Sequence, residues 1–237
     1  MMQLIGHRGA SGYAPENTIV AFEKAREKGC NFIEFDVMLS SDGIPFIFHD
    51  ESIKRTTNGR GKFGLLPSDY LQTLDAGRWY SRKFKGEKIP TLAEAIEWLN
   101  NNNMHANIEI KPYPGTTDET TIALLTQINR YWPSEKNLPL ISSFELNALT
   151  LTRSLSPEIP IGFLMHKWQE NWLQIAKDLN CYSIHLNCKI AKPSRIEAII
   201  QEGYKVYVYT INSKRKAKKL SALGVDAIFS DYPDLLL

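Results

Sequence analysis

Residues 32–37 read Phe-Ile-Glu-Phe-Asp-Val, a pattern that places two acids in an otherwise apolar strand. Successive side chains of a strand point to opposite faces, so Glu34 and Asp36 project together from one face and apolar residues fill the other. Two neighbouring carboxylates repel, and burying them without a partner is costly. The pair therefore indicates either a half-exposed edge strand with two solvated acids, or a site where a cation, a proton or a cluster of donors neutralises them.

The size and composition of the chain indicate an ordinary globular protein. Its 237 residues come close to the roughly 250 residues of an eight-stranded α/β barrel. A hydrophobic fraction of 43% and a charged fraction of 23% exclude a disordered or fibrous chain. The net charge of +2 argues against a nucleic-acid partner, and we interpret the basic run at residues 213–219 as the solvated face of a helix.

The cysteines and the hydropathy pattern favour a cytoplasmic location. Cys30, Cys181 and Cys188 are odd in number and form no C-x-x-C motif, which is typical of small buried thiols in a reducing compartment. The sequence contains neither a signal-like apolar run nor one long enough to cross a membrane. We therefore expect no stable membrane insertion.

Strand-like and helix-like runs alternate along most of the chain. Strands are expected at residues 2–5, 32–37, 45–48, 105–111, 138–143, 160–164, 183–186, 204–209 and 227–229. The alternation predicts an α/β fold, namely a closed parallel barrel of the TIM type, (β/α)8, with one extra strand after the second. An open doubly wound sheet is the alternative, but no G-x-G-x-x-G or P-loop motif supports it.

Residues 51–90 break this rhythm. Glycines and aromatic residues interrupt basic residues there, which predicts a small loop-rich insertion within a single catalytic domain spanning residues 1–237. Trp79 in this segment could lie over a substrate or pack within a small core of the segment itself. Thr91 with Glu94 has the spacing of a capping box, so a helix should begin there.

Polar residues follow the expected strands at their carboxyl ends, which meet at one rim in a parallel barrel. Glu34, Asp36 and Glu109 supply only oxygen ligands, which suit one hard divalent cation, Mg²⁺ or Ca²⁺, better than Zn²⁺. Arg8 and Lys111 add fixed positive charge. A metal beside two cations indicates a site for a phosphate group.

Two histidines also follow expected strands. His7 and His49 would flank this site and could serve as general acid and general base for cleavage of a phosphodiester. The sequence does not distinguish which of them is the base, nor whether the nucleophile is water or a neighbouring hydroxyl of the substrate that forms a cyclic phosphate. His105, His166 and His185 are interpreted as structural or surface residues.

Several short motifs of this chain resemble those of the glycerophosphodiester phosphodiesterases, in the same order from residue 6 to residue 233. They are Gly6-His7-Arg8-Gly9, Pro15-Glu16-Asn17-Thr18, Glu34-Phe35-Asp36, Phe48-His49-Asp50, Arg55-Thr56-Thr57-Asn58-Gly59, Glu109-Ile110-Lys111, Ser142-Ser143-Phe144 and the segment from Asp226 to Pro233. The resemblance covers nearly the whole chain and is closest to the small cytosolic bacterial members.

The resemblance implies a barrel enzyme that hydrolyses a small glycerophosphodiester to sn-glycerol 3-phosphate and an alcohol. It assigns the acid and base roles to His7 and His49, and metal binding to Glu34, Asp36 and Glu109. For substrate binding it implies Arg8, Lys111, Phe144 and Tyr209. Tyr209 stands where the family usually has tryptophan, and Ala227, Phe229 and Ser230 depart from its closing motif, so the preference for the alcohol or glycerol group is left open.

Two other functions remain open at this stage. A related barrel phosphodiesterase could act on lysophospholipids or phosphoinositides, although residues 51–90 offer no clear apolar rim for a lipid. A non-catalytic barrel could bind a phosphorylated ligand, but such a protein should lack one of the histidines or carboxylates.

Overall fold

The computed structural model describes residues 2–235. Its strands are β1 (Gln3–His7), β2 (Phe32–Leu39), β3 (Pro45–Ile47), β4 (His105–Ile110), β5 (Leu140–Ser143), β6 (Ile161–Met165), β7 (Ser183–Asn187), β8 (Lys205–Tyr209) and β9 (Ala227–Ser230). Its α-helices are α1 (Ile19–Glu27), α2 (Ser68–Thr73), α3 (Leu92–Asn101), α4 (Thr117–Tyr131), α5 (Leu146–Leu155), α6 (Trp172–Asp178), α7 (Pro193–Gln201) and α8 (Lys214–Ala222). Two 3₁₀ helices cover Phe63–Leu65 and Arg82–Phe84.

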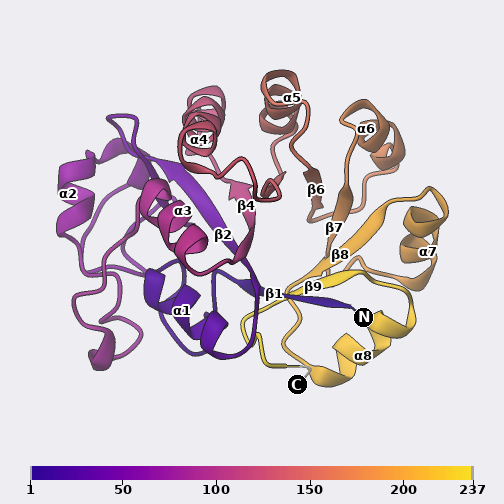
Figure 1. Cartoon of the computed structure of the whole chain (residues 1–237), viewed down its shortest axis with the longest axis horizontal. Coiled ribbons are helices and arrows are strands. Elements are labelled where there is room, and N and C mark those ends of the chain that lie inside the picture. Colours follow the sequence, from indigo (N-terminus) through magenta and orange to yellow (C-terminus); the bar gives the residue numbers. More distant parts are fainter. Residues whose placement is uncertain (1, 236–237) are drawn as a thin grey trace.

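Parallel strands close into a barrel, as the sequence predicts. The order is β1-β9-β8-β7-β6-β5-β4-β2, and β1 pairs with β2 to complete the ring. The helices lie around the outside of the sheet (Figure 1). The register aligns Asp36 on β2 with Glu109 on β4, so carboxylates of adjacent strands lie at the same height in the barrel.

One strand of the sheet, β3, lies outside the ring of eight, and it is the extra strand expected after the second. β3 runs antiparallel to β2 and pairs Ile47 with Val37, which adds a short edge outside the ring. Some strand boundaries differ from those expected; for example, β5 begins at Leu140 rather than at residue 138. Within residues 2–235 no helix follows β9, so the alternation ends on a strand.

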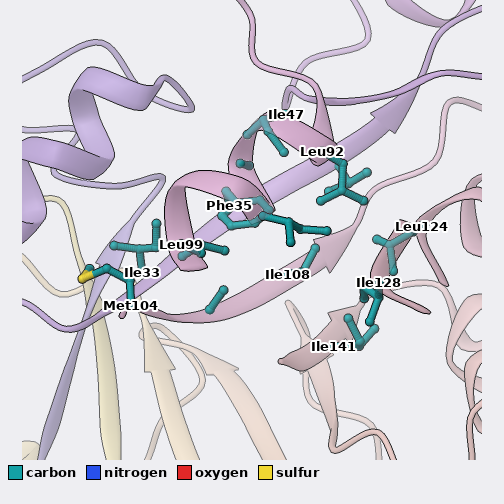
Figure 2. Packing of buried hydrophobic residues seen from close by; sticks show 14 of the residues in the cluster. Ile33, Phe35, Ile47, Leu92, Leu99, Met104, Ile108, Leu124, Ile128 and Ile141 are labelled. Carbon is teal, nitrogen blue, oxygen red and sulfur yellow. The ribbon is translucent and has the colours of Figure 1, made fainter. Parts of the chain in front are cut away.

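A large apolar core lies between the barrel wall and the helices. Ile33, Phe35 and Val37 are fully buried in it, which confirms that the apolar face of this strand is the outer one. Figure 2 shows Phe35 and Ile108 of the sheet facing Leu92 and Leu99 of α3. Burying this face on helices leaves the alternate residues of β2 for the barrel interior.

Residues 51–90 connect β3 to α3 and lie beside β2, on the side of the molecule away from α7 (Figure 1). They contain α2 and both 3₁₀ helices, short elements that the prediction of a loop-rich insertion did not specify. The segment shares a small core with Met38 of β2 and Phe46 of β3, in which the rings of Phe48 and Phe63 stack at 4.6 Å. This core fixes the segment against β3 and the neighbouring barrel strand β2.

Three smaller expectations can also be compared with the structure. Thr91 and Glu94 form the predicted capping box at the start of α3. The three cysteines are free thiols. Among the helices of residues 2–235, none is both long enough and apolar enough to span a bilayer.

Candidate active site

Three acids of neighbouring strands meet inside the barrel. Ligand oxygens of Glu34, Asp36 and Glu109 all lie within 4.8 Å of one another. These residues are only 4%, 1% and 9% exposed, so they are not the solvated acids of an edge strand. The two-residue spacing in β2 and its register with β4 create the cluster.

The three carboxylates carry more negative charge than their surroundings balance. Burial, together with the charges of Asp36 and Glu109, raises the pKa of Glu34 well above its usual value. Burial and the charge of Asp36 raise the pKa of Glu109 to about 7. Burial also opposes ionisation of Asp36, but the positive charges of Arg8 and Lys111 and the hydrogen bond from Asn17 hold its pKa below the usual value. An all-oxygen cluster with unbalanced negative charge fits a hard divalent cation.

The turn after β1 brings a backbone donor to this cluster. Arg8 and Gly9 both have positive φ, 53° and 79°, and the amide of Arg8 donates to Glu34 Oε2 at 2.9 Å. A Cβ on Gly9 would lie 2.6 Å from the carbonyl carbon of Ala21, so only glycine fits there. Asn17 Nδ2 donates to Asp36 Oδ2 at 2.9 Å. The loop between β1 and α1 therefore fixes two of the three carboxylates.

Each of the two predicted histidines has a carboxylate on its Nδ1. His7 Nδ1 lies 2.7 Å from Asp231 Oδ1, and His49 Nδ1 lies 2.6 Å from Asp50 Oδ1. Hydrogen bonds hold the pKa of Asp50 and of Asp231 at about 2 although burial opposes their ionisation, so both are acceptors near neutral pH. An ionised carboxylate only accepts, and therefore Nδ1 carries the hydrogen and Nε2 is left for chemistry.

A cavity of about 340 Å³ at the carboxyl ends of the strands joins these groups. Eight of the nine predicted site residues line it: His7, Arg8, Glu34, His49, Glu109, Lys111, Phe144 and Tyr209. Asp36, the ninth, lies in the carboxylate cluster itself. The structure thus brings the whole predicted set together.

The two cations of the site have different surroundings. Burial disfavours the charge of Arg8, but Asp36, Glu16 and Glu34 outweigh it and raise the pKa of Arg8 above its usual value. Lys111 Nζ lies 3.5 Å from Glu109 Oε1 and 5.8 Å from the ring centre of Phe144. Tyr209 meets Phe144 edge to face at 6.0 Å. An aromatic corner therefore borders the positive charge.

Other residues at the site were not singled out from the sequence. Asp50 and Asp231 orient the histidines, and the wall opposite the carboxylates includes His166 and Asn187, joined at 3.2 Å. His166 is an exposed residue, as interpreted, but it also borders the cavity. The motifs His49-Asp50 and Ser230-Asp231 are the signals that could have indicated the two acids.

The remaining histidines and Trp79 lie elsewhere. His185 is fully buried in the barrel, stacked on Tyr207 at 4.9 Å, and His105 begins β4 at the other end of the strands. Trp79 does not line the cavity, and its Nε1 donates to Ala76 O within the segment. Of the two possibilities for Trp79, packing within its own segment fits these contacts.

Comparison with known proteins agrees with the geometry of the site. The profile of the glycerophosphoryl diester phosphodiesterase family matches residues 7–235. The chain is 35% identical over 238 residues to a glycerophosphodiester phosphodiesterase of Caldanaerobacter subterraneus subsp. tengcongensis, covering 99% of this chain and 96% of the relative.

Solved structures give the same result. A phosphodiesterase of Oleispira antarctica, in complex with its product sn-glycerol-3-phosphate, is similar with a TM-score of 0.95 and 40% identity, covering 98% of this chain and 94% of that one. A glycerophosphodiester phosphodiesterase of Agrobacterium tumefaciens is 30% identical with a TM-score of 0.78, covering 99% and 98%. Because the family profile spans nearly the whole chain, this protein belongs to the glycerophosphoryl diester phosphodiesterase family.

Proposed function

We propose that this protein hydrolyses small glycerophosphodiesters to sn-glycerol 3-phosphate and an alcohol, with one divalent cation and two histidines as the catalytic groups. The observation that carries the proposal is the arrangement within one cavity, where two carboxylate-oriented imidazoles accompany three clustered carboxylates. The Oleispira antarctica relative is described with sn-glycerol-3-phosphate as its product, which supports the same product here.

The cation site is formed by Glu34, Asp36 and Glu109, whose oxygens suit Mg²⁺ or Ca²⁺. A bound divalent cation would supply Lewis-acid stabilisation of the charge that develops on the phosphoryl oxygens. Arg8 and Lys111 contribute positive charge beside it and hold the anionic diester in the cavity. Phe144 and Tyr209 provide apolar contact for the carbon atoms of the substrate.

His49 is suited to accept a proton. Burial and the positive charges of Arg8 and Lys111 outweigh the carboxylates of Asp36 and Asp50 and lower the pKa of His49 below its usual value, which favours the neutral ring near pH 7. With Nδ1–H held by Asp50, Nε2 can take the proton of the attacking hydroxyl group. That hydroxyl belongs to water or to the adjacent glycerol carbon, and in the second case a cyclic phosphate forms and is then opened by water.

His7 completes the reaction on the leaving side. The new P–O bond forms as the bond to the departing alcohol breaks, and His7 Nε2 donates the proton that this alkoxide requires. Asp231 keeps the ring of His7 oriented throughout. With direct attack by water, the proton taken up by His49 and the proton given by His7 balance, and solvent exchange restores both rings. With a cyclic phosphate, His7 takes the proton of the water that opens it and His49 returns its proton to the glycerol oxygen, which restores both rings.

Residues 1–237 would act as a single catalytic domain, because Arg55 of the segment 51–90 pairs with Glu16 of the barrel loop. The substrate would be a small molecule in the cytoplasm, and neither nucleic acid nor a lipid bilayer would be a partner.

The test is to supply glycerophosphocholine, glycerophosphoethanolamine, glycerophosphoinositol and lysophosphatidylcholine with Mg²⁺ or Ca²⁺, and to measure sn-glycerol 3-phosphate from the first three and lysophosphatidic acid and choline from the last. We expect release from at least one glycerophosphodiester, and the rates rank the alcohol groups. Cleavage of lysophosphatidylcholine alone would instead indicate the lipid-directed phosphodiesterase. No cleavage of any of them by folded, metal-supplied protein would indicate a barrel that only binds phosphorylated ligands.

A further inference from the structure

Arg55, in the segment 51–90, contacts the two carboxylates that bind His49 and Arg8. Arg55 forms a fork with Glu16, with Nη1–Oε2 and Nη2–Oε1 distances of 2.7 Å. The same guanidinium donates to both oxygens of Asp50, through Nε at 2.5 Å and Nη2 at 3.0 Å. Arg55 thus joins two carboxylates that would otherwise repel.

Each of these carboxylates holds a group that faces the cavity. Asp50 accepts from Nδ1 of His49 at 2.6 Å. Glu16 accepts from Nη1 of Arg8 at 2.6 Å, and Arg8 Nε in turn lies 3.3 Å from Asp36. A continuous series of charge-assisted contacts therefore runs from His49 through Asp50, Arg55 and Glu16 to Arg8.

The backbone that carries Arg55 is fixed by its neighbours. Ile53 is fully buried in the core of the segment, and Thr57 Oγ1 donates to its carbonyl at 2.6 Å. Thr57 Oγ1 also accepts from the amide of Gly59 at 3.0 Å. Because this loop is held at both sides of Arg55, its guanidinium is presented in a defined place.

We propose that Arg55 is a positioning residue that sets His49 and Arg8 in their working geometry by holding Asp50 and Glu16 together. The inference rests on the proposed function of this site, and it makes the segment 51–90 part of the catalytic apparatus. Planar, bidentate recognition of two carboxylates requires a guanidinium, which lysine cannot reproduce.

Magnitudes distinguish a positioning role from a stabilising one. The side chain of Arg55 is 45% exposed, but its partners Glu16 and Asp50 are only 13% and 24% exposed, so loss of these ion pairs should lower the melting temperature measurably without unfolding the protein. Small misplacement of catalytic groups, in contrast, can reduce rates by about 10²-fold. Loss of Arg55 should therefore slow turnover in protein that is still folded at the assay temperature, so the loss of rate is not explained by unfolding.

The experiment compares kcat and KM for sn-glycerol 3-phosphate release by the wild type and by Arg55→Ala, Arg55→Lys, Asp50→Asn and the double variant Arg55→Ala/Asp50→Asn. Lys62→Ala is the matched control, because Lys62 forms an exposed pair with Glu51 in the same segment at 3.4 Å. We expect Arg55→Ala to lower kcat/KM by about 10- to 10²-fold, Arg55→Lys to recover only part of it, and Lys62→Ala to equal the wild type.

The double variant tests whether Arg55 acts through Asp50. Residues that act as one unit give non-additive losses, so the loss of kcat in the double variant should be close to that of Asp50→Asn alone. What Arg55→Ala adds in that background should be an increase in KM, through Glu16 and Arg8.

Results that contradict the positioning role of Arg55 differ from results that contradict the proposed function. Full multiplication of the two losses in kcat, or wild-type kcat and KM for Arg55→Ala, would overturn the positioning role. If Arg55→Ala does not fold, the same criteria apply to Arg55→Lys, alone and with Asp50→Asn. Absence of turnover by the wild type would instead contradict the proposed function.

Discussion

His7 and Asp231 are separated by 224 positions in the sequence and joined by a 2.7 Å contact between Nδ1 and Oδ1. His7 ends β1, and Asp231 follows β9, the strand that pairs with β1. Ser11 and Asn212 also donate to Asp231 and fix its carboxylate. The contact that orients this histidine therefore depends on closure of the barrel between its first and last strands.

Removal of this contact should slow catalysis without abolishing it. His7→Ala should lower kcat by about 10²-fold or more, since a proton donor is lost. Asp231→Asn keeps the ring but removes the ionised acceptor that fixes its tautomer, so a loss approaching that of His7→Ala is expected. Release of sn-glycerol 3-phosphate gives both values, and Asp178→Asn on the surface of α6 is the control. A larger loss in Asp231→Asn than in His7→Ala would contradict these assignments.

Asp231 should also contribute to stability in a pH-dependent way. Burial opposes its charge, but hydrogen bonds from His7, Asn212 and Ser11 lower its pKa from 3.8 to about 2. A depressed carboxylate pKa stabilises the fold above the unfolded-state value, and this contribution is lost as pH falls through the folded-state value. Urea unfolding of wild type and Asp231→Asn should differ by up to about 2 kcal/mol near pH 6.

That difference in unfolding free energy should narrow progressively as pH falls from about 4 to about 2. The same two proteins, measured at half-unit intervals over this range, give the curve directly. A difference that stays constant down to pH 2 would mean that Asp231 is not stabilised as an anion in the folded protein.

Replacement of Glu109 by glutamine should stabilise the metal-free protein. Its folded-state pKa of about 7 lies above the ordinary 4.5, so its ionisation weakens folding as pH rises between these values. In EDTA at pH 8, Glu109→Gln should raise the melting temperature, whereas exposed Glu97→Gln on α3 should not change it.

The same substitution should have the opposite effect when metal is present. Mg²⁺ or Ca²⁺ should raise the melting temperature of the wild type, and do so less at pH 6 than at pH 8, because protons compete for the carboxylates. Glu109→Gln should largely lose this increase. Thermal scans with and without metal at both pH values would show it, and a lower melting temperature for Glu109→Gln in EDTA would be inconsistent with unbalanced charge in the cluster.

Gly9 and Gly43 provide a matched pair for testing the turn after β1. Both have positive φ, 79° and 84°, but a Cβ at residue 43 meets nothing within 4 Å. Gly43→Ala should therefore cost only backbone strain, about 1 kcal/mol. Gly9→Ala adds a clash with the backbone of Ala21 and should cost about 2 kcal/mol or more, with loss of activity because the amide of Arg8 is displaced. Equal unfolding free energies for the two variants would show that the turn is not tightly packed.

Much of the fold and of the site follows from local sequence patterns. The alternation in β2 predicts both the outer apolar face and the inner acids, and the matching Glu109 and Lys111 predict a second strand beside it. Strand ends then place seven of the nine candidate residues at one rim, because the carboxyl ends of parallel strands converge there, whereas Phe144 and Tyr209 were implied by the family resemblance.

The supporting contacts could not be predicted in the same way. Asp231 reaches His7 only because β9 closes on β1, and no local pattern specifies that register. Arg55 reads as one basic residue among several in a loop, and its fork with Glu16 depends on how the core around Ile53 holds that loop. Side-chain networks between distant segments are products of tertiary packing, whereas periodicity reports only the element that carries each residue.

The most direct test of the account is metal-dependent release of sn-glycerol 3-phosphate by the wild type and by His49→Ala at the same pH. The account predicts that EDTA stops release by the wild type, that Mg²⁺ or Ca²⁺ restores it, and that His49→Ala with either metal stays slower by about 10²-fold or more. Release that persists in EDTA, or a His49→Ala variant that turns over at the wild-type rate, would contradict it.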